Sequence, residues 1–147
     1  MRTLTTLAAV TAATTLAIAG PAAASSRLSL AGTGASTVDA TSVVVSGEVS
    51  GTPVSGAYAG TVTVPGGVPA VGECAPASAD LRVGDAGGPT ITLHSDGEVC
   101  STIVPWVLQD FRGRFEVTDS SRRGWRSIRG FLEVRALNGL SDVYATS

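Results

Sequence analysis

The chain has 147 residues, of which 15% are charged and 5% aromatic, and its formal net charge at pH 7 is −2. A chain of this length holds one domain with a single core, which excludes a large multidomain mechanism. The composition also excludes a disordered acidic chain and a basic nucleic-acid-binding domain.

The first 24 residues are typical of a secretory signal peptide. Arg2 gives a positive start, an apolar run extends from Leu7 to Ala19, and Ala22 and Ala24 satisfy the A-x-A cleavage rule. This run is shorter than the roughly 20 residues that a membrane-spanning helix needs. We therefore expect cleavage after Ala24, secretion from the cell, and no transmembrane segment in the mature chain.

After the signal, residues 25–41 are small and polar, which predicts a flexible lead-in that contributes little to the core. The single domain is then expected to span residues 42–147. There the apolar residues alternate with period two, and no stretch of ten residues carries a helical stripe, so the domain is predicted to be all-β. The alternation predicts strands over residues 43–49, 57–64, 79–83 and 91–94.

A hairpin turn is predicted at Asp96-Gly97, because glycine tolerates the positive φ of a type I′ turn. A fifth strand then begins at Val99 and is interrupted by Pro105, and the longest strand runs from Trp106 to Thr118. Further predictions are a polar loop over residues 119–126, a strand over 128–136, a hairpin turn at Asn138-Gly139 and a short strand over 143–145. Seven or eight short antiparallel strands indicate a barrel or a sandwich.

Cys74 and Cys100 are the only cysteines of the chain. An exported protein leaves the reducing cytosol, so the pair predicts one disulfide bond. A metal or redox site has no support, because there is no C-x-x-C motif and only one histidine. We expect no metal and no cofactor.

Three segments carry a resemblance to a known family. They are Gly56–Thr61, with the pattern G-x-Y-x-G-T, Phe111–Thr118, with F-x-G-x-F-x-V, and Gly130–Val134, with G-x-L. The chain resembles the allene oxide cyclase and dirigent-like barrel superfamily over less than half of its mature length. The resemblance implies an up-and-down antiparallel β-barrel of about eight strands with an apolar interior, and an immunoglobulin-like sandwich is the alternative fold.

The resemblance supplies no catalytic residue, because none of the family's catalytic positions matches a position here. The chain departs from the family pattern at Ser120–Trp125, where the family has small residues and glycines. In this respect the chain looks closer to secreted bacterial barrels of this shape than to any characterised enzyme.

No catalytic residue emerges from the sequence either. His94 is the only histidine and is predicted on the outward face of a strand, and no G-x-S-x-G motif is present. Asp96 and Glu98 are expected to solvate the turn that they flank. Glu48 is expected to face outward, because Val45, Gly47 and Val49 share the other face of its strand.

An exposed patch for an anionic partner is predicted in the polar loop. Guanidinium groups beside an indole can bind phosphates, sulfated sugars or an acidic protein surface. The alternative is a solvated loop whose arginines pair with Asp119 and Glu116. Nucleic acid is not expected as the partner, because the mature chain is net acidic. The patch comprises Arg122, Arg123, Trp125, Arg126 and Arg129.

A second candidate site is the barrel interior. Its inward residues either fill the core or line a cavity for a small apolar ligand, with the glycines Gly60, Gly113 and Gly130 leaving space. The residues predicted to line this interior are Tyr58, Val62, Phe111, Phe115, Leu132 and Val134.

Three functions follow from these features. The first is a secreted, non-enzymatic binding or interaction module whose partner is a small apolar ligand or an extracellular protein. The second is an isomerase or cyclase-like enzyme with an apolar pocket, which the family resemblance implies. The third is an extracellular protease inhibitor that presents the Pro65–Pro76 loop, anchored by Cys74.

Overall fold

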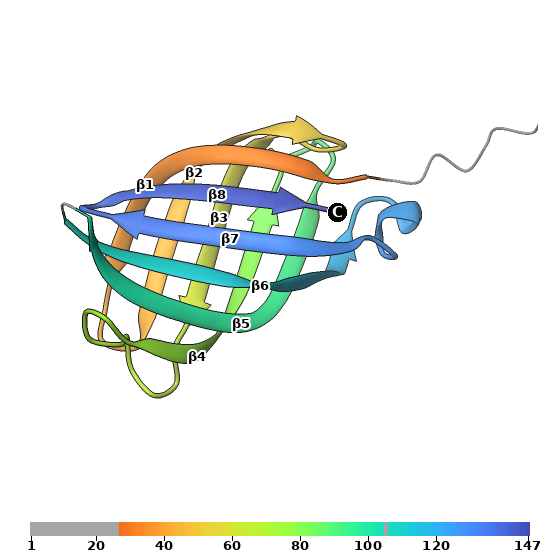
Figure 1. The fold of residues 1–147 in the computed structure, drawn as a ribbon. Helices are drawn as coiled ribbons and strands as arrows, with labels where there is room; N and C mark the ends of the chain where they lie inside the picture. The colour runs from red at the N-terminus through yellow and green to blue at the C-terminus, as the bar shows by residue number, and fades with distance from the viewer. Residues whose placement is uncertain (1–26, 105) are drawn as a thin grey trace, which may run out of the picture.

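The computed structural model describes residues 27–104 and 106–147. The chain forms a closed antiparallel barrel in which each strand pairs with the next and β8 pairs with β1 (Figure 1). The predicted up-and-down barrel is confirmed, and the sandwich alternative is wrong. The strands are β1 (Ser29–Val38), β2 (Ser42–Thr52), β3 (Gly56–Thr63), β4 (Cys74–Val83), β5 (Ile91–Val104), β6 (Trp106–Ser120), β7 (Arg129–Leu137) and β8 (Leu140–Thr146).

The first strand corrects the expected lead-in over residues 25–41. β1 occupies Ser29–Val38 and pairs with both β2 and β8, so it closes the barrel. Its inward positions include Leu30, Gly32 and Gly34, which are mostly too small to give a clear hydrophobic period. The strand is stabilised by pairing, because without it β2 and β8 would each leave an edge unpaired. The expected signal peptide lies outside the described residues.

The predicted turn at Asp96-Gly97 is also wrong. β5 runs without a break through both residues, and Gly97 lies opposite Ala77 on β4 and Gly113 on β6. A Cβ at Gly97 would lie 2.0 Å from the carbonyl oxygen of Arg112. The glycine therefore permits the close approach of two strands. The fourth and fifth predicted strands are one strand, and this error offsets the missed β1 in the strand count.

The last hairpin follows the prediction closely. Asn138 and Gly139 connect β7 to β8 with φ values of 49° and 78°. Both angles are positive, as a two-residue type I′ turn requires.

The core fills the inside of the barrel. Apolar side chains alternate inward along the strands, and those of Phe111, Phe115, Leu81, Leu93 and Leu132 are among the largest that are fully buried. A barrel of eight strands has an interior about wide enough for its own side chains. Among the described residues, no helix is long and apolar enough to cross a membrane.

The connection from β6 to β7 lies at one end of the barrel. A 3-10 helix, η1 (Arg123–Trp125), lies in this connection and is followed by the buried Ile128. Figure 1 shows η1 at the same end as the start of β1 and the C-terminus. Trp125 is only 7% exposed and belongs to the core cluster together with Leu28. Apolar side chains thus continue the core at this end.

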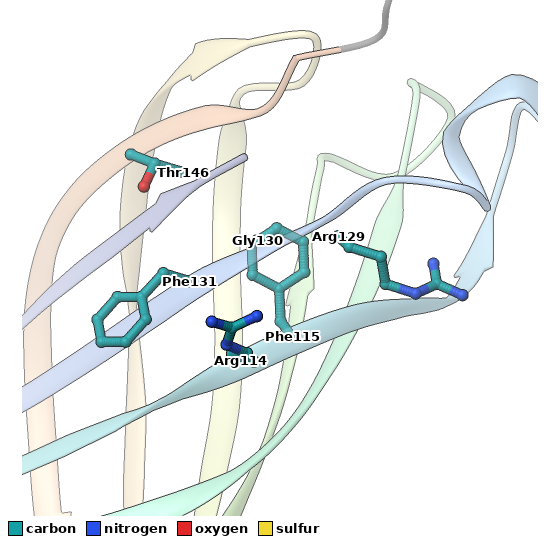
Figure 2. A pocket seen from close by; sticks show the side chains of 6 residues that line it. All are labelled: Arg114, Phe115, Arg129, Gly130, Phe131 and Thr146. Carbon is teal, nitrogen blue, oxygen red and sulfur yellow. The ribbon is translucent and has the colours of Figure 1, made fainter.

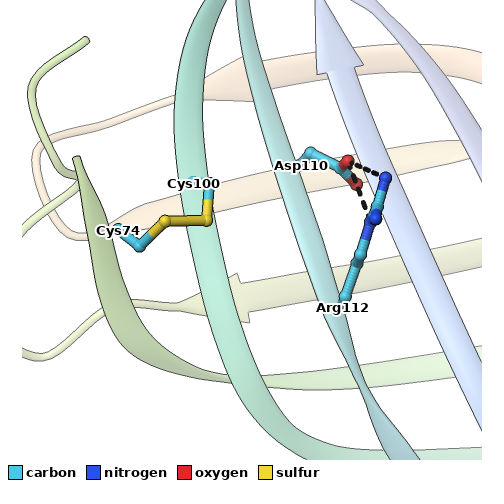
Figure 3. The surroundings of a disulfide bond; sticks show 4 residues. All are labelled: Cys74, Cys100, Asp110 and Arg112. Atoms are coloured by element: carbon cyan, nitrogen blue, oxygen red, sulfur yellow. Dashed lines mark hydrogen bonds and ion pairs between the residues drawn. A yellow bond between two sulfur atoms is a disulfide. The ribbon is translucent and has the colours of Figure 1, made fainter. Parts of the chain in front are cut away.

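The predicted disulfide is present between Cys74 and Cys100, which lie directly opposite each other on β4 and β5. The bond lies on the wall of the barrel close to Asp110 and Arg112 (Figure 3).

Candidate functional site

The six residues predicted to line the interior all face inward and are buried, with Leu132 at 0% and Val134 at 3% exposure. The best-defined hollows of the described chain are instead open to solvent and lined mainly by outward-facing residues. Both observations favour the filled core over the ligand cavity.

Two of the buried hydroxyls, which also include those of Ser95 and Ser101, form a bonded pair in the interior that the sequence did not predict. The Tyr58 hydroxyl lies 2.7 Å from Oγ of Ser141, and Ser141 donates to the carbonyl oxygen of Ala35 at 3.0 Å. Because Ser141 gives its proton to Ala35, the Tyr58 hydroxyl is the donor of the pair, and burial raises the pKa of Tyr58, which keeps this hydroxyl protonated. Each hydroxyl of the pair is therefore used within the fold, as buried polar groups require.

The predicted patch around η1 is only partly exposed. Trp125 is buried, with the guanidinium of Arg122 stacked 5.5 Å from its ring centroid, so the prediction of an exposed indole is wrong. Sequence alternation gave no information here, because Trp125 lies in a helical turn and not in a strand. The indole holds the loop against the core, and the arginines face solvent.

Two arginines of the patch have the acidic neighbours of the solvated-loop alternative. Arg126 lies 3.9 Å from Asp119, and Arg129 lies 3.8 Å from Glu116. Arg129 also donates to the carbonyl oxygens of Arg126 and Ile128 at 2.8 and 3.0 Å. Within the described part of the chain, Arg122 and Arg123 form no ion pair. The patch therefore divides into a paired half and an open half.

The outward face of β4 and β5 holds the only histidine between two acids, as predicted for its orientation. Nδ1 of His94 lies 2.8 Å from Asp80, and Nε2 lies 3.4 Å from Asp96. The hydrogen bond to Asp80 raises the pKa of His94 above its ordinary value. The hydrogen bond to Asp80 therefore orients the imidazole on the outer wall of the barrel. The Asp96 carboxylate thus lies beside His94. It does not flank a turn as predicted, because Asp96 lies within β5.

A second charged group lies on the outward face of β6 and β7. Arg112 binds Asp110 at 2.9 Å and Glu133 at 3.2 Å. Burial and the neighbouring Glu133 carboxyl raise the pKa of Asp110 to about 6, although the bond to Arg112 acts in the opposite direction. Glu48, by contrast, is exposed on β2 and faces outward, as predicted.

The raised pKa of Asp110 predicts a pH-dependent effect on stability. The folded state binds this proton more tightly than the unfolded chain, so the stabilisation is present below about pH 4 and is lost as the pH rises through about 6. Asp110→Asn has no such proton to lose. The unfolding free energy of the variant, relative to the wild type, is expected to increase between about pH 4.5 and 7.5. Urea unfolding at both pH values measures it, and a difference that is constant or falls contradicts the prediction.

A hollow of about 500 Å³ lies on the outer wall over β6, β7 and β8, next to the row that holds Arg112. Figure 2 shows its residues, which come from β6, β7 and β8. Arg114 and Arg129 supply positive charge, and Phe131 lies on the same face with 46% of its surface exposed. The hollow is lined by Arg114, Phe115, Arg129, Gly130, Phe131 and Thr146.

Sequence analysis found Arg129 but did not assign Arg114 or Phe131 to a site. A signal was present in the outward positions of β7, where Phe131 stands between Arg129 and Glu133. An aromatic residue at an outward position between two charged ones lacks the burial that ordinarily explains it. The neighbourhood of Arg114 depends on strand register, which alternation alone does not give.

The described residues place Cys74, Glu98 and Cys100 within reach of one another. The two sulfur atoms are bonded together, so they are not thiolate ligands for a metal ion.

The Pro65–Pro76 loop, which would act in a protease inhibitor, is tied to the barrel by backbone hydrogen bonds. Val68 donates to Ala40 at 2.8 Å, and Gly72 donates to Ser101 at 2.7 Å. Val68 also packs against the core, while Val71 is 48% exposed. The loop thus folds back on the barrel over part of its length.

Comparisons with family models, curated proteins and solved structures gave no match for this chain.

Proposed function

We propose that this chain is a secreted, non-enzymatic barrel that binds an anionic partner at the end capped by η1. The observation that carries the proposal is the open half of the arginine patch. Arg122 and Arg123 are exposed and form no ion pair within the described residues, while buried Trp125 holds their loop in place. Because the loop is already fixed to the core, binding loses little conformational freedom.

The rest of the molecule is consistent with a binding role. The barrel interior is occupied by apolar side chains, His94 is hydrogen-bonded to Asp80, and one oxygen of Asp110 binds Arg112. The disulfide between β4 and β5 agrees with an oxidising compartment, where a secreted module works. The cyclase-like and inhibitor functions stay predictions from the sequence.

Retention on immobilised heparin tests the proposal. A protein with a net negative charge is held by a polyanion only through a local positive surface. We expect the wild-type domain to be retained at low salt, and the double variant Arg122→Gln/Arg123→Gln to elute at clearly lower salt. The matched control is Arg112→Gln/Arg135→Gln, which removes the same charge from the barrel wall nearer the opposite end and should elute like the wild type. A wild type that flows through, or a control that loses retention equally, overturns the proposal.

A further inference from the structure

We propose that the hollow between Arg114 and Phe131 is a binding site for a small organic anion that carries a flat apolar group, such as an aryl sulfonate or aryl carboxylate. The inference goes beyond the proposed function, because it assigns the barrel a second, separate ligand site on its wall.

Outward side chains form rows across the strands, and in these rows acids and arginines alternate. In one row Glu98, Arg112 and Glu133 lie side by side on β5, β6 and β7, and Arg112 binds Glu133. In the next row Asp96 and Arg114 occupy the corresponding places, but Phe131 stands where the acid would be. The pattern therefore leaves Arg114 without an acid on its β7 side.

The acid on the β5 side of Arg114 lies next to His94. The Asp96 carboxylate lies 3.4 Å from Nε2 of His94. Among the described residues, Arg114 forms no ion pair, whereas Arg112 binds two carboxylates. A guanidinium with no protein partner has all its donors free for an incoming anion, and its planar fork suits a sulfonate or carboxylate.

The second arginine of the hollow is held in place. Arg129 donates to two backbone carbonyls of its own loop, which fix its side chain beside Glu116. Arg129 thus lines the hollow with its guanidinium turned toward the loop and Glu116 (Figure 2), and the anion is left to Arg114.

The exposed ring of Phe131 indicates that the ligand has an apolar part. Its side chain is 46% exposed on a face that is otherwise charged, and Thr146 is its neighbour on β8. A ring in this position offers a stacking surface to a flat group whose anion reaches Arg114. The volume of about 500 Å³ lies in the range of small-molecule sites. A small amphiphilic anion fits these features better than an extended polymer.

Two fluorescent probes that differ in one charge test the proposal. They are 1-anilinonaphthalene-8-sulfonate and N-phenyl-1-naphthylamine, which has the same rings without the sulfonate. We expect the folded domain to bind the sulfonate saturably with one site, and to bind the neutral amine about tenfold more weakly or worse. Thermal unfolding of each sample checks that the protein is folded, because partly folded states also bind the sulfonate.

Substitutions locate the site. Arg114→Gln and Phe131→Ser are each expected to weaken sulfonate binding by about tenfold, and Phe131→Tyr is expected to restore it. Arg82→Gln on β4 removes the same charge away from the hollow and should leave binding unchanged. Equal binding of both probes, or an equal loss with Arg82→Gln, overturns the proposal.

The outcome also separates this site from the η1 patch. If heparin retention depends on Arg122 and Arg123 but the sulfonate does not bind, only the hollow is rejected. If the sulfonate binds through Arg114 while heparin is not retained, the polyanion surface is rejected and the small-anion site stands.

Discussion

Phe111→Ala is expected to lower the free energy of unfolding by about 3–5 kcal/mol. Phe111 is 1% exposed and lies between Val99 on β5 and Val134 on β7. Removing its ring leaves a void that rigid strands on both sides cannot fill. Urea unfolding of the two proteins measures the loss, with the slope against urea unchanged if both unfold from the same compact state.

Phe131→Ala is the matched control for this prediction. Phe131 lies on the same wall of the barrel but points outward and is 46% exposed, so its removal is expected to change stability by less than about 1 kcal/mol. A hollow interior would predict a different result, because Phe111→Ala would then only enlarge a space that already exists. Similar losses in the two variants would contradict the filled core.

Removing the disulfide is the second large effect. Cys74 and Cys100 are 26 positions apart, and a crosslink closing a loop of this length is worth about 3.5 kcal/mol on the chain-entropy model. The double variant Cys74→Ala/Cys100→Ala is expected to lose about this much unfolding free energy. It should still form the barrel, because the pairing of β4 with β5 continues as far as Val83 and Ile91.

Urea unfolding without reducing agent measures the loss, and far-UV circular dichroism checks that the strands remain. A loss below about 1 kcal/mol would contradict the prediction, because the crosslink would then restrict the unfolded chain very little. Urea unfolding of the wild type in the presence of a reducing agent measures the same loss of unfolding free energy independently.

Alternation predicted the fold class well because the inside of a small barrel is apolar and its outside is charged. The long strand from Trp106 and the Asn138-Gly139 hairpin follow from local signals, one from period two and the other from turn chemistry. The disulfide was also predictable, because a chain with only two cysteines allows only one intramolecular bond.

Other features depend on contacts between distant residues. Asp96-Gly97 has the composition of a turn, but Gly97 serves the close approach of β5 to β6, which only the closed barrel imposes. β1 has small inward residues and is held by its two neighbours. Local propensity is overridden by tertiary pairing in both cases.

The candidate sites also contain residues that the sequence predicted correctly and features that depend on the folded structure. The six interior residues were identified correctly as inward-facing, because parity along a strand decides which face a side chain occupies. The exposed arginine patch was half right, because the burial of Trp125 follows from the position of η1 over the core and not from its neighbours in sequence. The isolation of Arg114 depends on the register of three strands.

The central claim is that the barrel is filled inside and binds anions on its outer surface, at the η1 end and in the hollow beside Arg114. An NMR titration of the ¹⁵N-labelled domain with 1-anilinonaphthalene-8-sulfonate tests it most directly, because each backbone amide reports separately. The account predicts saturable shifts centred on the amides of Arg114, Phe131 and Thr146, with those of Val62 and Leu81 on the opposite wall unchanged. The largest shifts at Val62 and Leu81, with none at Arg114, would place the ligand inside the barrel and contradict the account.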